Sequence, residues 1–305
     1  MRLAAWLVIP LGLCAGCADI MKRLTVDQTA GVLADAGRAF DRENDVELAR
    51  AAIPASLKTV EGFLEAHPHQ RILLRLLAEN YMSYAFGFLE DEAEAVQDSD
   101  PARAEALRQR ALNLHLRARG FGLRLLALDL PELAVSLERG EAPTPEQLDT
   151  AWSREHLEGL FWAANPWGAA INVGKDQPAL VAQVGIVKAL IERCAAIDDT
   201  YYWGGPHLAL GALEAAMPVA LGGDAEAARQ HFERALEITE GQHLMTKVLY
   251  ARLVGTQTGD RALFERVLGE VLSVEPDINP RLVLANTLAQ LRARRYLAAI
   301  DDYFI

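Results

Sequence analysis

The sequence predicts an all-α protein whose helices stack as paired hairpins. Leucine and alanine dominate its 305 residues, whereas β-branched and aromatic residues are sparse, and this composition favours helix. After the turn Gly223-Asp224, the residues Ala228, Phe232 and Ala235 are spaced by four and then three positions. This spacing places the three side chains on one helix face, because an α-helix repeats about every 3.6 residues. Small residues on that face let a neighbouring helix approach, and the aromatic ring fills the gap.

The same pattern recurs near the C-terminus. Gly259-Asp260 follows roughly 36 residues after the first Gly-Asp turn, and Phe264, Leu268 and Val271 occupy the matching offsets. A period of about 34 residues is typical of tetratricopeptide repeats, in which helical hairpins stack into a superhelix. The sequence therefore predicts a tetratricopeptide-like array, or α-solenoid.

The N-terminal half shows the same repeat spacing less clearly, in a hairpin that ends at Pro68. The residues at the expected offsets before and after this proline are Ser56, Val60, Phe63, Leu74, Leu77, Ala78 and Tyr81. Repeats at both ends of the chain, with an irregular aromatic-rich middle between them, suggest one continuous domain.

Several helix ends can also be predicted. Pro54 is expected to open a helix, because a proline at the first helical position loses no hydrogen bond. Thr144 and Gln147 have the spacing of a capping box. Asn279-Pro280 is expected to cap a last helix that runs to about Tyr303 and covers the end of the array.

The chain is acidic, with a net charge of −12 at pH 7. This charge argues against a nucleic-acid partner, because phosphates require a basic face. The acidic run Glu90–Asp100 is expected to be a solvated loop or helix end rather than a binding site.

The N-terminus has the features of a secretory signal. Arg2 precedes the uncharged run Leu3–Ala18, which is shorter than the roughly 20 residues of a membrane-spanning helix. Ala15-Gly16-Cys17 resembles the end of a bacterial lipobox, although Cys14 stands where that motif usually has leucine. The resemblance implies cleavage before Cys17, acylation of Cys17 and a periplasmic protein held on a bacterial membrane by lipid.

We therefore expect a signal peptide at residues 1–16, a lipidated linker at residues 17–24 and a single helical domain at residues 25–305. The alternative is an ordinary secretory signal that leaves Cys17 as a free thiol. Cys194, in an apolar helical segment, is expected to be a small core residue.

Aromatic residues cluster in the middle of the chain. They suggest either a bulky core or an apolar cavity with a few polar groups that orient a ligand. Trp152 belongs to the same cluster. The candidate ligand-binding or partner-binding residues are Trp162, Trp167, Asn172, Tyr201, Tyr202, Trp203 and His207.

The sequence contains no pattern that indicates catalysis. No HExxH motif, Gly-rich phosphate loop or nucleophile motif occurs, and His67 and His69 around Pro68 make a poor zinc site. We therefore expect no catalytic residues, no metal and no cofactor. A hydrolase would require a cluster of perturbed carboxylates or histidines inside the cavity.

Eight motifs together resemble one known family, the T-component lipoproteins associated with TRAP transporters (the TatT family). The motifs are Trp162-Ala-Ala, Trp167-Gly168, Ile171-Asn172, Lys175-Asp176, Tyr201-Tyr202-Trp203-Gly-Gly-Pro-His-Leu, Leu221-Gly-Gly-Asp, His231-Phe-Glu-Arg-Ala-Leu and Lys247-Val-Leu-Tyr-Ala. The resemblance implies a periplasmic, lipid-anchored helical protein with tetratricopeptide-like repeats and an internal channel or pocket, and it is compatible with a homo-oligomer.

The function that this resemblance implies is that of a non-enzymatic accessory to a tripartite ATP-independent periplasmic (TRAP) solute importer. Such a protein would bind the solute-binding protein of the importer, and an apolar or organic-acid ligand in its cavity. The alternative is a structural scaffold lipoprotein that assembles envelope proteins without a small ligand.

Overall fold

The computed structural model describes residues 13–151, 153–217 and 223–304, with side chains from residue 20 onward. Within these ranges every regular element is a helix, which confirms the predicted all-α class. The first half of the chain forms α1 (Leu13–Asp41), α2 (Val46–Ala66), α3 (Arg71–Tyr84), the π-helix η1 (Ala85–Glu90), α4 (Asp91–Ala95), α5 (Pro101–Leu126), α6 (Pro131–Glu138) and α7 (Pro145–Thr150). The second half forms α8 (Arg154–Val173), α9 (Pro178–Val181), α10 (Val184–Ile197), α11 (Tyr201–Ala216), α12 (Ala225–Ile238), α13 (Leu244–Leu249), the π-helix η3 (Tyr250–Gly255), α14 (Thr256–Thr258), α15 (Arg261–Leu272), the 3₁₀ turn η4 (Pro276–Ile278), α16 (Val283–Ala298) and α17 (Ile300–Tyr303).

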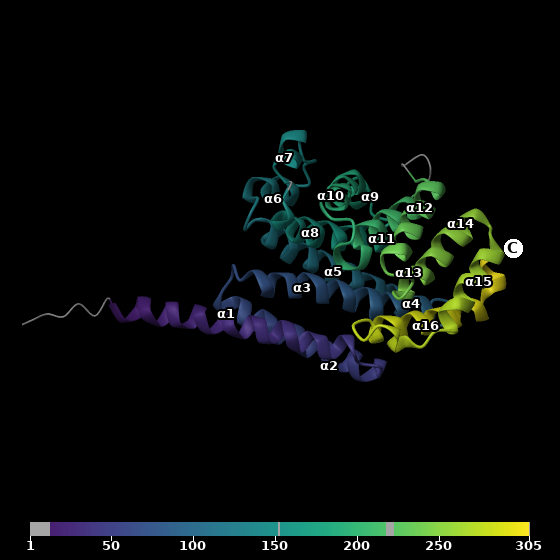
Figure 1. Cartoon of the computed structure of the whole chain (residues 1–305), viewed down its shortest axis with the longest axis horizontal. Coiled ribbons are helices and arrows are strands. Elements are labelled where there is room, and N and C mark those ends of the chain that lie inside the picture. Colours follow the sequence, from purple (N-terminus) through teal and green to yellow (C-terminus); the bar gives the residue numbers. More distant parts are fainter. Residues whose placement is uncertain (1–12, 152, 218–222, 305) are drawn as a thin grey trace, which may run out of the picture.

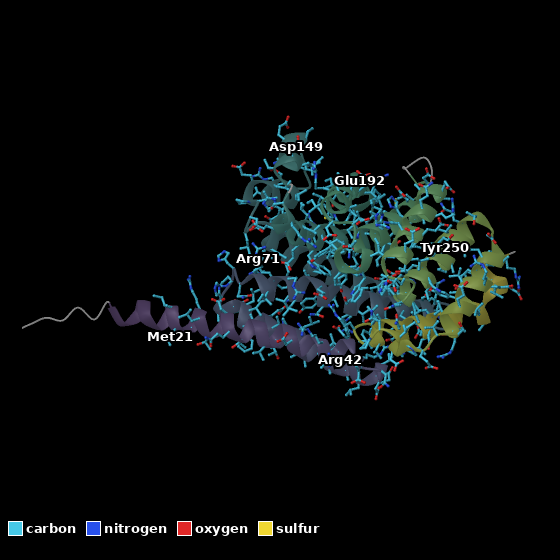
Figure 2. All side chains as sticks on the ribbon, viewed as in Figure 1. Met21, Arg42, Arg71, Asp149, Glu192 and Tyr250 are labelled. Atoms are coloured by element: carbon cyan, nitrogen blue, oxygen red, sulfur yellow. The ribbon has the colours of Figure 1, made fainter. Side chains whose placement is uncertain are left out.

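The first two helices pack against the last long helix. Figure 1 shows α1 and α2 along the lower edge of the molecule and α16 beside them, and residues of α16 contact both helices. The N-terminal part of α1 projects away from the rest, and Met21 lies on this projection (Figure 2). Its side chains Ile20, Met21 and Leu24 are exposed although they are apolar.

The Gly-Asp turns cap helices as predicted. The Asp224 carboxylate accepts hydrogen bonds from two amides of the first turn of α12, and Asp260 accepts one at the start of α15. Ala228, Phe232 and Ala235 have no exposed surface, so the spacing identified the buried face of α12 correctly. The capping box of Thr144 is also present.

Two predicted helix starts are wrong. Pro54 lies inside α2, because the Asp45 carboxylate accepts from the Glu47 and Leu48 amides and starts the helix earlier. A capped helix with a buried face tolerates the loss of one backbone hydrogen bond at the proline.

The second wrong start is that of the last long helix. Asn279 does not cap α16, which begins only at Val283. The Asn286 side chain donates to the carbonyl of Pro276 at 3.0 Å and to that of Gln242 at 3.0 Å. These bonds hold the preceding residues as a separate turn, and the C-terminal helical segment is divided into α16 and α17.

Helices α5 and α8 cross at glycines. A Cβ atom added to Gly122 on α5 would overlap the backbone carbonyl of Trp162 on α8. A Cβ added to Gly159 on α8 would lie 2.8 Å from the Cα of Leu126 on α5. The two helices therefore touch backbone to backbone, and this contact sets the position of α8.

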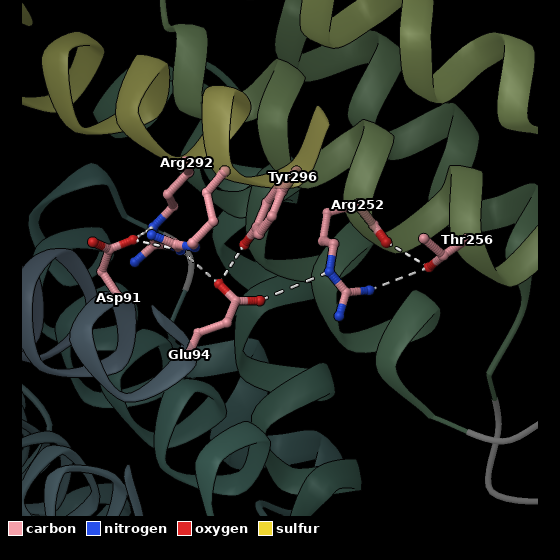
Figure 3. Close-up of polar contacts among 7 residues, drawn as sticks. Asp91, Glu94, Arg252, Thr256, Arg292 and Tyr296 are labelled. Carbon is pink, nitrogen blue, oxygen red and sulfur yellow. Dashed lines mark hydrogen bonds and ion pairs between the residues drawn. The ribbon is translucent and has the colours of Figure 1, made fainter. Parts of the chain in front are cut away.

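A partly buried cluster of ion pairs joins α4 to α16 (Figure 3), and we call it the Asp91 clamp. Asp91 contacts Arg292 at 2.9 Å and Arg295 at 2.7 Å, and Arg295 also contacts Glu94 at 2.8 Å. The Tyr296 hydroxyl donates to Glu94 at 2.7 Å. The side chains of Arg292 and Asp91 are only 5% and 12% exposed. The expectation that this acidic run is solvated is therefore wrong for Asp91 and Glu94, whose carboxylates pair with arginines from the far end of the chain. It holds for the end of the run, where residues 97–100 are exposed and Asp100 caps α5.

Candidate functional site

A cavity of about 750 Å³ lies inside the helical body. Its walls come from α1, α2, α3, η1, α8, α10, α11, α13 and α16, so segments from most of the chain surround it. Most lining residues are apolar, and a few asparagine, serine and charged side chains interrupt them. Cavities of roughly 300–1,000 Å³ with this composition are typical of small-molecule sites.

A strained turn at the start of α11 carries aromatic residues into the cavity wall. Tyr202 (φ 47°), Trp203 (φ 62°) and Gly204 (φ 71°) all adopt the left-handed conformation. This conformation costs roughly 1–2 kcal/mol for each residue with a Cβ atom, and such strain is concentrated at functional sites. Tyr202 and Trp203 both line the cavity.

Packing behind this turn holds the rings in place. Tyr202 meets Trp162 edge to face, with ring centroids 4.8 Å apart, and Phe161 meets Tyr201 edge to face at 5.2 Å. A Cβ atom added to Gly205 would lie 2.7 Å from the Phe161 ring, so only glycine allows this approach. Tyr202 remains 38% exposed and lines the cavity.

A small ion-pair network forms part of the same wall. Arg75 on α3 pairs with Glu79 and, at 3.2 Å, with Glu158 on α8. The Tyr202 hydroxyl donates to Glu79 at 3.2 Å. Burial raises the pKa of Glu79, and the charge of Arg75 opposes that rise. Burial also raises the pKa of Tyr202, which therefore stays protonated and able to donate.

Both π-helical segments border the cavity. Phe86, Gly87 and Phe88 of η1 and Leu253 of η3 are among the lining residues. π-Helical turns are rare and occur frequently at functional sites, because the wider turn redirects side chains. The Asp91 clamp steadies η1, since Arg292 also donates to the carbonyl of Phe86.

The structure brings four of the seven predicted ligand or partner residues into the cavity wall: Asn172, Tyr201, Tyr202 and Trp203. Trp162 lies one layer behind, where its indole N–H donates to the Tyr201 hydroxyl at 3.1 Å. Their role in binding stays a prediction.

The other two predicted residues lie away from the lining. Trp167 is completely buried and donates to Gln183 at 2.9 Å, with the Arg119 guanidinium 3.8 Å from its ring centroid. His207 pairs with His231, their Nδ1 atoms 2.8 Å apart, and joins α11 to α12. These contacts give Trp167 and His207 a structural role in packing the helices.

Several predictions concern residues beyond the described part. The signal peptide at residues 1–16 lies largely outside it, as does Trp152. Cys17 falls within the helical span of α1, but its side chain is outside the described set, so acylation stays a prediction. Cys194 is buried, as predicted, and burial raises the pKa of its thiol.

Sequence reasoning missed the charged residues of the cavity. Arg75, Glu79, Asp41 and Arg281 line it from α1, α3 and the segment before α16. Single charged residues in an acidic helical chain have no distinguishing spacing, so no sequence signal separated them from solvated ones.

Within the described residues, no helix is both long and apolar enough to span a bilayer. The same residues contain no group of three or more histidine, cysteine, aspartate or glutamate side chains arranged to hold a metal ion.

The helical body, the apolar cavity and the strained aromatic turn together define an all-helical protein with an internal candidate binding site. The chain matches the TRAP transporter T-component family over residues 42–304. It is also 26% identical over 308 aligned residues to an uncharacterized protein of Treponema pallidum (strain Nichols), and the alignment covers 96% of this chain and 94% of that protein. The chain therefore belongs to the TRAP transporter T-component family, whose members are accessories of transport rather than a known class of enzymes.

Proposed function

We propose that this chain is a non-enzymatic, lipid-anchored periplasmic accessory of a TRAP importer, and that it takes up an apolar ligand in its cavity. The cavity lined by the left-handed aromatic turn is the observation that carries the ligand part of this proposal. Family membership supports the association with TRAP transport.

The proposed architecture is one tetratricopeptide-like domain spanning residues 25–305. The Asp-capped helices α12 and α15 support it, because each buries the face that the repeat spacing predicts. Stacked hairpins form concave or tubular surfaces, and these surfaces are where such arrays bind partners.

The proposed anchor is an acylated Cys17. The lipobox-like sequence supports it, and so do the exposed apolar side chains Ile20, Met21 and Leu24 on the projecting part of α1. Apolar side chains close to an acyl anchor would add to its contact with the bilayer.

The proposed ligand gains free energy mainly from burial. Each square ångström of apolar surface moved out of water contributes about 25 cal/mol. The walls of α11 and α16 offer such surface through Leu208, Ala212, Leu284 and Leu288.

The cavity part of the proposal is tested by placing a bulky side chain inside the cavity. Ala212 lines the cavity, so Ala212→Trp should lower the affinity for the apolar dye Nile red because the indole takes up part of the space. Ala106 is exposed on α5, so Ala106→Trp is the matched control and should bind the dye like the wild type. If Ala212→Trp folds and still binds Nile red with wild-type affinity, the cavity is not the ligand site.

The partner part needs a separate measurement. Calorimetric titration with the solute-binding protein of its TRAP importer should show a saturable complex. A structural scaffold would bind envelope proteins without taking up the dye, so uptake of Nile red into the cavity distinguishes the two functions. Absence of any complex at micromolar concentrations would refute the partner part.

A further inference from the structure

His243 is a half-buried polar residue of the cavity wall. It immediately precedes α13 and lines the cavity. Its ring nitrogen Nδ1 lies 2.7 Å from the hydroxyl oxygen of Thr246, a residue with no exposed surface. Within the described residues, the other ring nitrogen, Nε2, has no hydrogen-bond partner. The protein therefore fixes one nitrogen of this ring and leaves the other for a ligand.

The contact with Thr246 determines which ring nitrogen carries the proton. The Thr246 hydroxyl has no other acceptor within the described residues, and a buried hydroxyl that donates to nothing is costly. The hydroxyl therefore donates to Nδ1, which can accept only when the proton of the neutral ring is on Nε2. Burial lowers the pKa of His243 to about 4, so the ring is uncharged at neutral pH. The Nε2–H group is then an uncharged donor.

Asn286 of α16 holds His243 in place. The side-chain oxygen of Asn286 accepts from the amide of Leu244 at 3.0 Å, and its side-chain nitrogen donates to the carbonyl of Gln242 at 3.0 Å. Both neighbours of His243 are thus bound to one residue that has no exposed surface. These bonds place His243 next to the part of α16 that lines the cavity, including Ala285.

Two asparagines of the same wall are already engaged. Asn80 donates to the carbonyl of Leu76 at 2.8 Å, and Asn165 donates to the sulfur of Met82 at 3.4 Å. An oxygen atom of a ligand would instead find an unused donor at His243. An uncharged oxygen can accept this bond without bringing a charge out of water, whereas an ionised group would leave water to meet an uncharged ring.

We propose that the ligand is an uncharged molecule with an apolar body and a carbonyl oxygen, such as a ketone or an ester, and that this oxygen accepts a hydrogen bond from Nε2 of His243. The apolar body occupies the rest of the cavity. This inference rests on the proposed function, and it adds the chemical class of the ligand and the residue that recognises it.

The test measures displacement of Nile red at neutral pH by methyl laurate, laurate and tetradecane, each delivered from cyclodextrin, after the dye affinity of each variant has been measured. Methyl laurate and tetradecane have chains of equal length, but the alkane lacks oxygen. Methyl laurate should bind the wild type at least about tenfold more tightly than laurate, because an uncharged donor does not replace the hydration of a carboxylate.

The variant His243→Asn removes the donor at Nε2 but keeps a side-chain oxygen that can accept from the Thr246 hydroxyl. It should weaken methyl laurate about fivefold, the typical net contribution of one hydrogen bond, and leave tetradecane unchanged. His69 is exposed and does not line the cavity, so His69→Asn is the matched control and should change neither probe.

Equal affinity of methyl laurate for the wild type and His243→Asn would overturn the inference, and so would laurate binding as tightly as methyl laurate. If His243→Asn does not fold, infrared spectroscopy of the wild type decides the question. The hydrogen bond should lower the carbonyl stretching frequency of bound methyl laurate below its value in an alkane solvent, and a band at the alkane value would overturn the inference.

The outcomes also separate this inference from the proposed function. If tetradecane binds but His243 makes no difference to the ester, the hydrogen bond fails and the cavity function stands. If none of the three probes binds the wild type, the cavity function and this inference fail together.

Discussion

The contact between α5 and α8 gives the sharpest prediction about the framework of the cavity. Gly122 of α5 lies against the backbone of α8, and a Cβ atom there would lie 2.6 Å from the amide nitrogen of Ala163 and closer still to the carbonyl of Trp162. The groups that it would meet are main-chain atoms, which cannot rotate away as a flexible side chain can. Gly122→Ala must therefore push α8 outward, and α8 carries the cavity residues Phe161 and Asn172.

The magnitude follows from two opposing effects. Overpacking a core with one extra methyl group typically costs about 1–3 kcal/mol, and a clash with backbone belongs at the upper end. Replacing a helical glycine with alanine gains about 1 kcal/mol of helix propensity. We therefore expect Gly122→Ala to lower the free energy of unfolding by about 2 kcal/mol or more.

The assay is urea unfolding followed by circular dichroism, together with Nile red binding. Gly120 lies on the same helix with open space where its Cβ would be, so Gly120→Ala is the control and should raise the free energy of unfolding by up to about 1 kcal/mol. Dye binding should weaken in Gly122→Ala alone. If both variants gain stability equally, the close crossing of α5 and α8 is refuted.

Three further predictions concern the clamp, a half-buried histidine and the strained turn. Asp91→Asn should lower the free energy of unfolding by about 3 kcal/mol because it leaves the buried guanidinium of Arg292 without its carboxylate. Glu265 belongs to an exposed ion pair, so Glu265→Gln is the control and should lower the free energy of unfolding by less than about 1 kcal/mol. Equal losses in urea unfolding would contradict the burial of the Asp91–Arg292 pair. Burial lowers the pKa of His243 from 6.5 to about 4, so the unfolded state takes up the proton first and stability should fall by up to about 3 kcal/mol as the pH drops from 6.5 to 4. His243→Asn should lose this part of the acid sensitivity, and an unchanged pH profile of unfolding would exclude His243 as its source. Trp203→Gly relieves roughly 1–2 kcal/mol of left-handed strain but removes a cavity ring, so the unfolding free energy should change little while Nile red affinity falls; unchanged affinity would remove Trp203 from the site.

Local sequence signals predicted the parts of the fold that depend on neighbours along the chain. Asp224 and Asp260 cap helices, and the residues spaced after them are buried, because capping and helical periodicity act within one or two turns. The prediction that Pro54 starts a helix was wrong because the cap at Asp45 and the buried face of α2 outweigh the loss of one hydrogen bond. Such competition between local preferences and packing cannot be weighed from spacing alone.

Long-range features were beyond the reach of sequence patterns. Asp91 and Arg292 are 201 residues apart, and nothing in the acidic run distinguishes a clamp residue from a solvated one. The aromatic cluster did indicate a cavity or a core, and the structure contains both, with Tyr202 in the cavity wall and Trp167 in the core. The left-handed turn places Tyr202 in the cavity wall, and two consecutive aromatic residues with positive φ have no sequence signature.

The central claim is that the cavity holds an apolar ligand, and native mass spectrometry tests it most directly. After incubation with methyl laurate, the wild type and Ala106→Trp should each carry one bound molecule, while a smaller fraction of Ala212→Trp should carry one because the indole takes up part of the space. Equal adducts on the wild type and Ala212→Trp, or no adduct on the wild type, would contradict the account.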